Sequence, residues 1–224
     1  MNTLTTAPVS TLLTRLFAQA EAADAGIRAE YASLSPEARA SALNRANSNY
    51  RAFYSQAKNM YLPVSAETGT LLYMLARTSR ARSIVEFGTS FGISTVHLAA
   101  ALKDNGGGRL IGSEFEPSKA AQARENLKAA GLSDLVEIRE GDALESLARD
   151  LPDSIDLVLL DGAKVLYPRI LALLEPRLSP GALVVADNAD HNPEFLANIR
   201  AAGSGYLSVP FASDVEVSMR VAGA

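Results

Sequence analysis

The chain has 224 residues, of which 48% are hydrophobic and 21% charged, and its formal net charge is −4. This length is typical of one domain with room for an extension, and such a chain can bury about 70% of the surface of its unfolded form. It contains no cysteine, which excludes disulfides, thiolate metal sites and cysteine catalysis, and only His97 and His191 supply imidazoles, too few for a zinc cluster. Any bound metal must be held by oxygen atoms, which favours a hard divalent cation such as Mg²⁺.

Hydropathy and charge favour a cytoplasmic protein. The N-terminal segment has no basic stretch followed by an apolar run, and no apolar stretch approaches the ~20 residues of a membrane span. The acidic balance argues weakly against nucleic acid as the main partner, because binding to phosphates depends on Lys and Arg.

The first 80 residues have helical patterns. A first helix is predicted over residues 8–24. Ser35-Pro36-Glu37 predicts a second helix start, because serine caps helix N-termini and proline suits the first helical position. The apolar residues of this second helix continue to Ala57, and Pro63-Val64-Ser65 ends it. Ser65 then caps a further predicted helix over residues 66–79.

Strands and helices alternate from residue 82 onward. The predicted strands are residues 83–87, 109–114, 135–139, 155–161 and 182–186, and the predicted helices between them are 92–103, 117–130, 142–149 and a helix from about Pro168. Such alternation predicts a parallel sheet with right-handed crossovers. Residues 215–221 then alternate between apolar and polar, and together with residues 206–211 they predict a closing antiparallel pair. The expected fold is α/β: a Rossmann-like, doubly wound, mostly parallel seven-stranded sheet with an antiparallel C-terminal strand.

The stretch over residues 84–94 is the most informative one. A short buried strand runs into a turn with two glycines, Gly88 and Gly92, and the turn opens a helix. In an open α/β sheet, ligands bind beyond such strand ends. The spacing E-x-G-x-x-x-G-x-S differs from the G-x-G-x-x-G of dinucleotide sites, so a pyrophosphate ligand is disfavoured.

An acidic residue lies at or just after the end of each of the five parallel strands. One acid at a strand end is usually a helix cap or a solvated turn, but five such ends in one sheet are much less expected by chance. In a parallel sheet these ends open onto one edge. A row of carboxylates there suits a ligand with hydroxyls, amines and a positive charge, as in S-adenosylmethionine. The residues are Glu86, Glu114, Asp142, Asp161 and Asp187, the last followed by Asn188.

With these motifs, residues 60–221 resemble the class I S-adenosylmethionine-dependent O-methyltransferases of the catechol and caffeoyl-coenzyme-A type. The most specific element is Asp161-Gly162-Ala163-Lys164 with Tyr167, and the Asp187-Asn188 pair follows the next strand. The resemblance implies that Asp161, Asp187 and Asn188 bind a divalent metal, for which the composition favours Mg²⁺. It also implies that Lys164 is the general base, beside Asp161 in the catalytic centre.

The resemblance also implies a set of residues that bind the cofactor and a division of the chain. Residues 61–224 would form the S-adenosylmethionine-binding domain, and residues 1–60 a helical extension that covers the acceptor site or forms the interface of a homodimer. The acceptor would be a small hydroxylated molecule of the catechol type. The implied cofactor residues are Val64, Glu86, Gly88, Ser94, Glu114, Asp142 and Asp161.

Other interpretations stay open at this stage. The sequence around Lys164 is also consistent with an ordinary exposed lysine. The sequence of Asp187-Asn188 is also consistent with a simple turn. A polar loop residue such as His191 is more often idle than catalytic, and His97 fits a packing role in its apolar helix. Three tyrosines fit either an aromatic acceptor pocket or helix packing: Tyr50, Tyr54 and Tyr61.

The alternative functions are methylation of a tRNA nucleoside hydroxyl and a non-catalytic cofactor-binding module. The lack of a Lys/Arg cluster argues against the first, and the presence of Lys164 with both aspartates argues against the second. Residues 189–192, Ala-Asp-His-Asn, depart from the family pattern, and the following loop to Gly203 reads as short. Because this loop shapes acceptor choice in the family, the sequence leaves the acceptor open.

Overall fold

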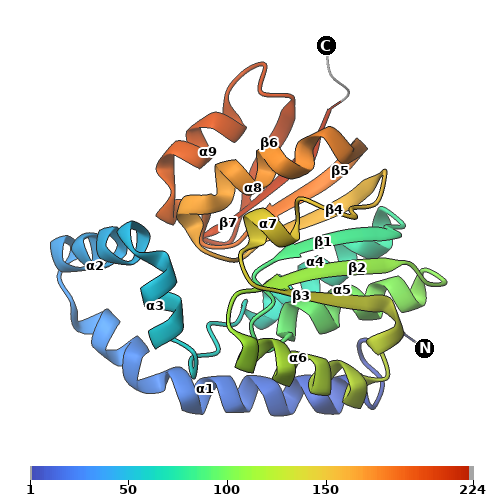
Figure 1. Ribbon diagram of the computed structural model, residues 1–224, viewed down its shortest axis with the longest axis horizontal. Coiled ribbons are helices and arrows are strands. Elements are labelled where there is room, and N and C mark those ends of the chain that lie inside the picture. The colour runs from blue at the N-terminus through green and yellow to red at the C-terminus, as the bar shows by residue number, and fades with distance from the viewer. Residues whose placement is uncertain (1, 222–224) are drawn as a thin grey trace.

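The computed structural model describes residues 2–221; residues 1 and 222–224, at the outer ends of the two predicted units, lie outside the described residues. A seven-stranded sheet with the order β3-β2-β1-β4-β5-β7-β6 forms the centre of the molecule (Figure 1). The pairs from β3 to β5 are parallel, and β7 is antiparallel to both of its neighbours. The predicted fold class is therefore confirmed. The strands are β1 (Ser83–Phe87), β2 (Arg109–Glu114), β3 (Val136–Glu140), β4 (Ile155–Leu160), β5 (Leu178–Ala186), β6 (Tyr206–Phe211) and β7 (Val215–Arg220).

Helices cover both faces of the sheet because the central strands are apolar on both sides. Alternate residues of β1 and β4 point to opposite faces: Ile84 and Leu157 pack in one core cluster, Val85 and Val158 in the other. The first cluster lies under α1, α4, α5 and α6, the second under α7, α8 and α9 (Figure 1). The helices in the sheet region are α4 (Ala66–Thr78), α5 (Ile93–Asp104), α6 (Pro117–Ala130), α7 (Ala143–Ser146), α8 (Tyr167–Leu174) and α9 (Pro193–Arg200), with 3-10 turns η1 (Ser133–Leu135), η2 (Lys164–Leu166), η3 (Glu175–Arg177) and η4 (Ala189–His191).

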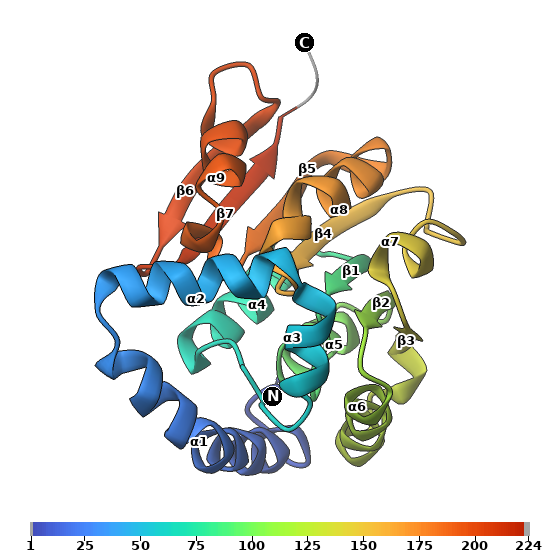
Figure 2. The ribbon, with the colours of Figure 1, turned by 60° about the vertical axis from the view of Figure 1, so that its left-hand side comes forward.

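Three helices precede the sheet: α1 (Val9–Ser33), α2 (Pro36–Ser48) and α3 (Tyr50–Gln56). The first half of α1 packs in the core with α5, whereas α2 and α3 stand beyond the carboxyl ends of the strands (Figure 2). The division of the chain near residue 60 stays a prediction. No helix within residues 2–221 is both long and apolar enough to cross a membrane.

The differences from the predicted elements have local causes. The first helix continues past residue 24 to Ser33 because no Gly-Pro pair or cap interrupts it. The predicted second helix breaks at Asn49, whose φ of −140° is not helical and whose side chain accepts a hydrogen bond from Ala52 N and so caps α3. The predicted loop after Asn192 contains α9, with Asn192 as its cap. Strand β5 begins at Leu178 because Ser179–Gly181 form an irregularity in the pairing with β4, not a turn before the strand.

Candidate active site

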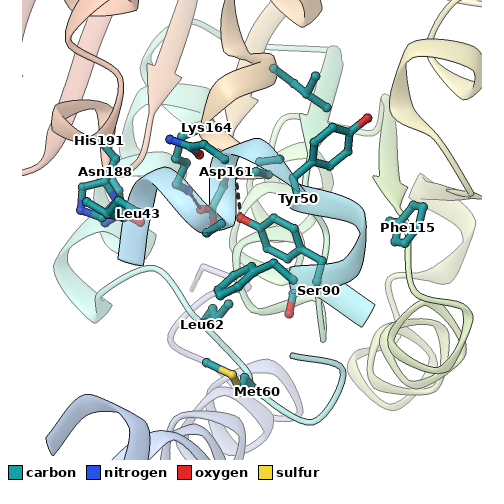
Figure 3. A pocket seen from close by; sticks show the side chains of 18 of the residues that line it. Leu43, Tyr50, Met60, Leu62, Ser90, Phe115, Asp161, Lys164, Asn188 and His191 are labelled. Carbon is teal, nitrogen blue, oxygen red and sulfur yellow. Dashed lines mark hydrogen bonds and ion pairs between the residues drawn. The ribbon is translucent and has the colours of Figure 1, made fainter. Parts of the chain in front are cut away.

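A cavity of about 760 Å³ lies at the carboxyl edge of the sheet, under α2 and α3 (Figure 3). Its volume is within the ~300–1,000 Å³ that is typical of small-molecule sites. The turns after β1 to β5 supply the polar part of its wall, and the N-terminal helices supply most of the apolar part. Six of the predicted site residues line this cavity: Gly88, Glu114, Asp142, Asp161, Lys164 and Asn188.

The turn after β1 depends on glycine at position 88. Gly88 has φ +98°, and a Cβ there would lie 2.5 Å from the carbonyl oxygen of Asp161. The turns after β1 and β4 thus approach each other as closely as backbone allows, and Asp161 N donates to Phe87 O at 2.8 Å. Ser90, in the same turn, has φ +49°, a conformation that is uncommon for a residue with a side chain and is often found at functional sites.

Glu86 and Ser94 are anchors of this turn in the structure. Glu86 is fully buried and lines neither cavity next to the turn. Its carboxylate accepts hydrogen bonds from Thr89 (3.0 Å), Ser94 (2.6 Å) and Thr95 (2.6 Å). Burial raises the pKa of Glu86 to about 7, although these three bonds oppose the shift. Ser94 lines a small pocket together with Val64, but its hydroxyl already donates to Glu86.

Glu114 and Asp142 face the cavity with one hydrogen bond on each of their oxygens. Glu114 accepts from Glu116 N (2.8 Å) and from Ser90 N (2.7 Å), and burial raises its pKa. Asp142 accepts from Leu144 N at 2.9 Å and thereby caps α7. Its other oxygen pairs with Arg51 of α3 at 2.5 Å, so the N-terminal helices are attached to the cavity wall at this point.

Lys164 and Asp161 form a buried ion pair, with 3.0 Å between Nζ and Oδ1. Lys164 also lies over the ring of Tyr167, 5.4 Å from its centre, and the Tyr167 hydroxyl donates to the carbonyl of Asp187 at 2.7 Å. Burial alone lowers the pKa of Lys164, but Tyr167 and Asp161 outweigh burial and raise the pKa well above its ordinary value. Lys164 is therefore a protonated partner of Asp161 in this structure, not an exposed lysine.

Asp187 and Asn188 complete an oxygen-rich group beside Asp161. Burial, and then the negative charge of Asp161, raise the pKa of Asp187 to about 8. Asn188 has φ +46°, and its Nδ2 donates to Asp214 at 3.2 Å, which leaves its Oδ1 without a partner among residues 2–221. Two buried carboxyls and one amide oxygen suit a hard divalent cation, whose charge would relieve the repulsion between the carboxyls. Within the same residues no three His, Cys, Asp or Glu side chains converge as a metal site, so such a site needs the amide of Asn188.

The wall contributed by the N-terminal helices is mainly aromatic and aliphatic. Tyr54 of α3 donates its hydroxyl to Gly162 O, in the turn after β4, at 3.4 Å. Its neighbours in this wall include Leu43, Tyr50, Phe53, Met60 and Leu62.

The remaining predicted residues differ in their positions. Tyr61 stacks on Phe91 with 4.0 Å between ring centres and packs against the core, outside the main cavity. His97 is buried with its Nδ1 2.8 Å from Ile93 O, which supports the packing role. His191 lines the cavity beside Asn188. Sequence reasoning missed Arg51 and Lys119, since neither belongs to a motif.

Relatives of the chain are found among known proteins. A family model described as a methyltransferase domain matches residues 85–189. The catechol O-methyltransferase of Niastella koreensis is 37% identical over 130 residues, which cover 57% of this chain and 58% of that protein, less than two thirds of its length. The catechol O-methyltransferase of Sus scrofa is 30% identical over 174 residues, which cover 74% of this chain and 92% of that protein. The solved structure of the O-methyltransferase TomG of Streptomyces achromogenes, in complex with S-adenosylmethionine, matches 81% of this chain and 90% of its own with a TM-score of 0.62 and 28% identity.

Proposed function

The chain belongs to the class I S-adenosylmethionine-dependent O-methyltransferases of the catechol and caffeoyl-coenzyme-A type, and on that premise we propose that it transfers a methyl group from S-adenosylmethionine to a hydroxyl of a small, catechol-like acceptor. The observation that carries this proposal is the group formed by Lys164, Asp161, Asp187 and Asn188: Lys164, Asp161 and Asn188 line a cavity of about 760 Å³, and Asp187 is buried next to Asp161. A packing role explains neither the ion pair at the cavity wall nor the two adjacent carboxyls, since buried charges are costly without a functional reason.

The cofactor would occupy the part of the cavity next to the turns after β1, β2 and β3. Gly88 lines this part of the cavity, and Glu114 has free lone pairs for the ribose hydroxyls. Asp142 would accept from the adenine amine, and Asp161 would face the methionine end; both residues line the cavity. Val64 and Ser94 remain candidates through the small pocket beside them. For Glu86 the buried hydrogen bonds support an indirect role, in which it holds the turn in place.

Asp161, Asp187 and Asn188 would hold a divalent cation, which favours the ionised form of an acceptor hydroxyl. Lys164 would take up the proton of that hydroxyl at Nζ. In the structure Tyr167 and then Asp161 raise its pKa, so Lys164 would first have to release its own proton to solvent, and a cation that compensates the charge of Asp161 would favour this release.

The acceptor would lie between the catalytic group and the wall of α2 and α3. Tyr50, Tyr54 and Leu43 line the cavity on this side and form an apolar and aromatic surface that suits a flat ring and excludes water. An in-line transfer needs the acceptor oxygen close to the methyl carbon and aligned with the bond that breaks, and correct orientation alone can supply about 7–11 kcal/mol of the barrier.

The test of the proposal is a calorimetric titration with S-adenosylhomocysteine, followed by a methyl-transfer assay on a panel of catechols. Wild-type protein should bind the ligand and methylate at least one catechol, and Glu114→Ala should weaken binding by at least about tenfold because a charged hydrogen-bond acceptor is lost. Binding without transfer to any catechol would refute the acceptor class and keep the cofactor. The absence of binding to wild-type protein would refute the whole proposal.

A homodimer and a cytoplasmic location stay predictions. The outer strand β6 exposes Leu207 and Val209 by 62% and 61%, which supports burial of this sheet edge against a second copy. Sedimentation of wild-type protein and of Val209→Lys would test the dimer. Wild-type protein should sediment as a dimer and the variant as a monomer, and equal sedimentation of both would refute a dimer interface at β6.

A further inference from the structure

Lys119 of α6 is a buried cation that the proposed reaction does not use. Its side chain lines the main cavity, yet the residue is only 4% exposed. Its Nζ donates one long hydrogen bond, to Ser90 Oγ at 3.4 Å, and lies 5.4 Å from the centre of the Phe91 ring. No carboxylate oxygen within residues 2–221 lies within 4.0 Å of this Nζ. An ammonium has three donors, so most of its hydrogen-bonding capacity is unused.

A buried ammonium with two unused donors is expected to have a further hydrogen-bond acceptor when its ligand is bound. Removing a polar group from water costs free energy unless its donors are paired, and buried polar atoms without partners are rare. Burial lowers the pKa of Lys119, and the nearby anions, Glu114 foremost, oppose this shift only in part. What this ammonium lacks among residues 2–221 is a further hydrogen-bond acceptor.

Glu114, which lines the same cavity, can accept further hydrogen bonds, whereas Lys119 can only donate them. Each oxygen of Glu114 accepts one backbone hydrogen bond, from Glu116 N and from Ser90 N, and has a further lone pair available. Both side chains line the same cavity, and Ser90 contacts both of them. A hydroxyl is the group that complements such a pair, because it accepts from the ammonium through its oxygen and donates its proton to the carboxylate.

We propose that Lys119 is a cofactor-binding residue whose Nζ donates to a ribose hydroxyl oxygen of S-adenosylmethionine while the same hydroxyl or its neighbour donates to Glu114. This inference rests on the proposed function, since it places the ribose at Glu114. It adds a residue that lies outside every motif of the sequence. Lys119 and Glu114 together then select a ribose over a deoxyribose, because a missing hydroxyl leaves both buried groups without their ligand partner.

The test compares the dissociation constants of three ligands for three forms of the protein. S-adenosylhomocysteine and its 2′-deoxy and 3′-deoxy forms are titrated into wild-type protein, Lys119→Met and Lys128→Met. Methionine has nearly the length of lysine but no donor, and Lys128 is an exposed lysine of the same helix, so it serves as the matched control. Circular dichroism and thermal unfolding of each variant accompany the titrations.

In wild-type protein, one of the two deoxy ligands should bind about 10- to 100-fold more weakly than the parent, the range expected for a hydrogen bond to a charged group. In Lys119→Met that ratio should fall by roughly tenfold, while Lys128→Met keeps the wild-type ratio. If Lys119→Met does not fold, Lys119→Gln replaces it, and its neutral donor should retain part of the ratio. A ratio in the Lys119 variants equal to that of wild type would overturn the inference and assign Lys119 a purely structural role. Failure of wild-type protein to bind S-adenosylhomocysteine would instead overturn the proposed function and this inference together.

Discussion

Glu86→Gln should make the stability of the protein less dependent on pH. Glu86 is fully buried, and burial raises its pKa from 4.5 to about 7 in the folded state. A carboxyl with a raised folded pKa stabilises the protein fully below its unfolded pKa, and this contribution is lost as the pH rises through the folded pKa. Between these two values the folded state holds a proton that the unfolded state has released, so the free energy of unfolding falls with pH. Glutamine has no charge to lose, so the variant lacks this term.

The size of the effect follows from the two pKa values. Their difference is about 2.5 units, from 4.5 to about 7, and each unit is about 1.4 kcal/mol, so the full term is about 3 kcal/mol. Part of this stabilisation is already lost between the unfolded pKa and pH 5, so a loss of about 2–3 kcal/mol remains between roughly pH 5 and pH 8. Three hydroxyls donate to this carboxylate, and their rotation lets them accept from the new amide, so the substitution preserves the packing.

Urea unfolding of wild-type protein and Glu86→Gln across this pH range measures the term directly. The quantity of interest is the difference in free energy of unfolding, because other titrating groups, Asp187 among them, contribute to both proteins and cancel to first order. Relative to the variant, wild-type protein should lose about 2–3 kcal/mol as the pH rises. A difference that stays constant within about 0.5 kcal/mol would show that Glu86 ionises normally and would refute the assignment of a buried anchor.

Three further substitutions test other contacts. Lys164→Met should lower kcat at least about 100-fold and leave the Kd for S-adenosylhomocysteine nearly unchanged, whereas an unchanged kcat would rule out Lys164 as the base. Tyr167→Phe should lower the free energy of unfolding by about 1–3 kcal/mol in urea titrations, because the carbonyl of Asp187 loses its buried donor; equal stability would show that water replaces the hydroxyl. Arg51→Met should speed hydrogen exchange in α3 but cost less than about 1 kcal/mol of global stability, and unchanged exchange would mean that other contacts hold α3.

The sheet was predictable because its signals are local. Runs of apolar residues between glycine turns placed β1 at residues 83–87 and β2 at residues 109–114, as observed. The carboxyl edge of a parallel sheet then required Glu114, Asp142 and Asp161 to lie near one another, and the cavity confirms that they share a wall.

The errors concern elements whose signals compete. Pro180-Gly181 normally marks a turn, but here β5 continues through it because the pairing with β4 absorbs the irregularity. Asn192-Pro193 carried a readable helix start, a cap followed by proline, and α9 begins there.

Contacts between distant segments were beyond the reach of sequence patterns. Arg51 and Asp142 are 91 residues apart in the chain, and no periodicity relates α3 to the turn after β3. Lys119 lies in a helix with no motif around it, and its burial and its contacts with Ser90 and Phe91, in the turn after β1, appear only in the folded chain. The indirect role proposed for Glu86 has the same origin: its three hydroxyl partners come from the turn and helix that follow it, and their convergence is a property of the folded state.

The most direct test of the central claim is the rate of methyl transfer from S-adenosylmethionine to a catechol by wild-type protein and Asp187→Ala, with Mg²⁺ and with a chelator. The account predicts turnover by wild-type protein with Mg²⁺, a loss of at least about 100-fold with chelator, and a similar loss in Asp187→Ala under both conditions. Full activity of Asp187→Ala in chelator would contradict the assignment of Asp161, Asp187 and Asn188 to a metal. No turnover of any catechol by the Mg²⁺-supplied wild-type protein would contradict the proposed reaction.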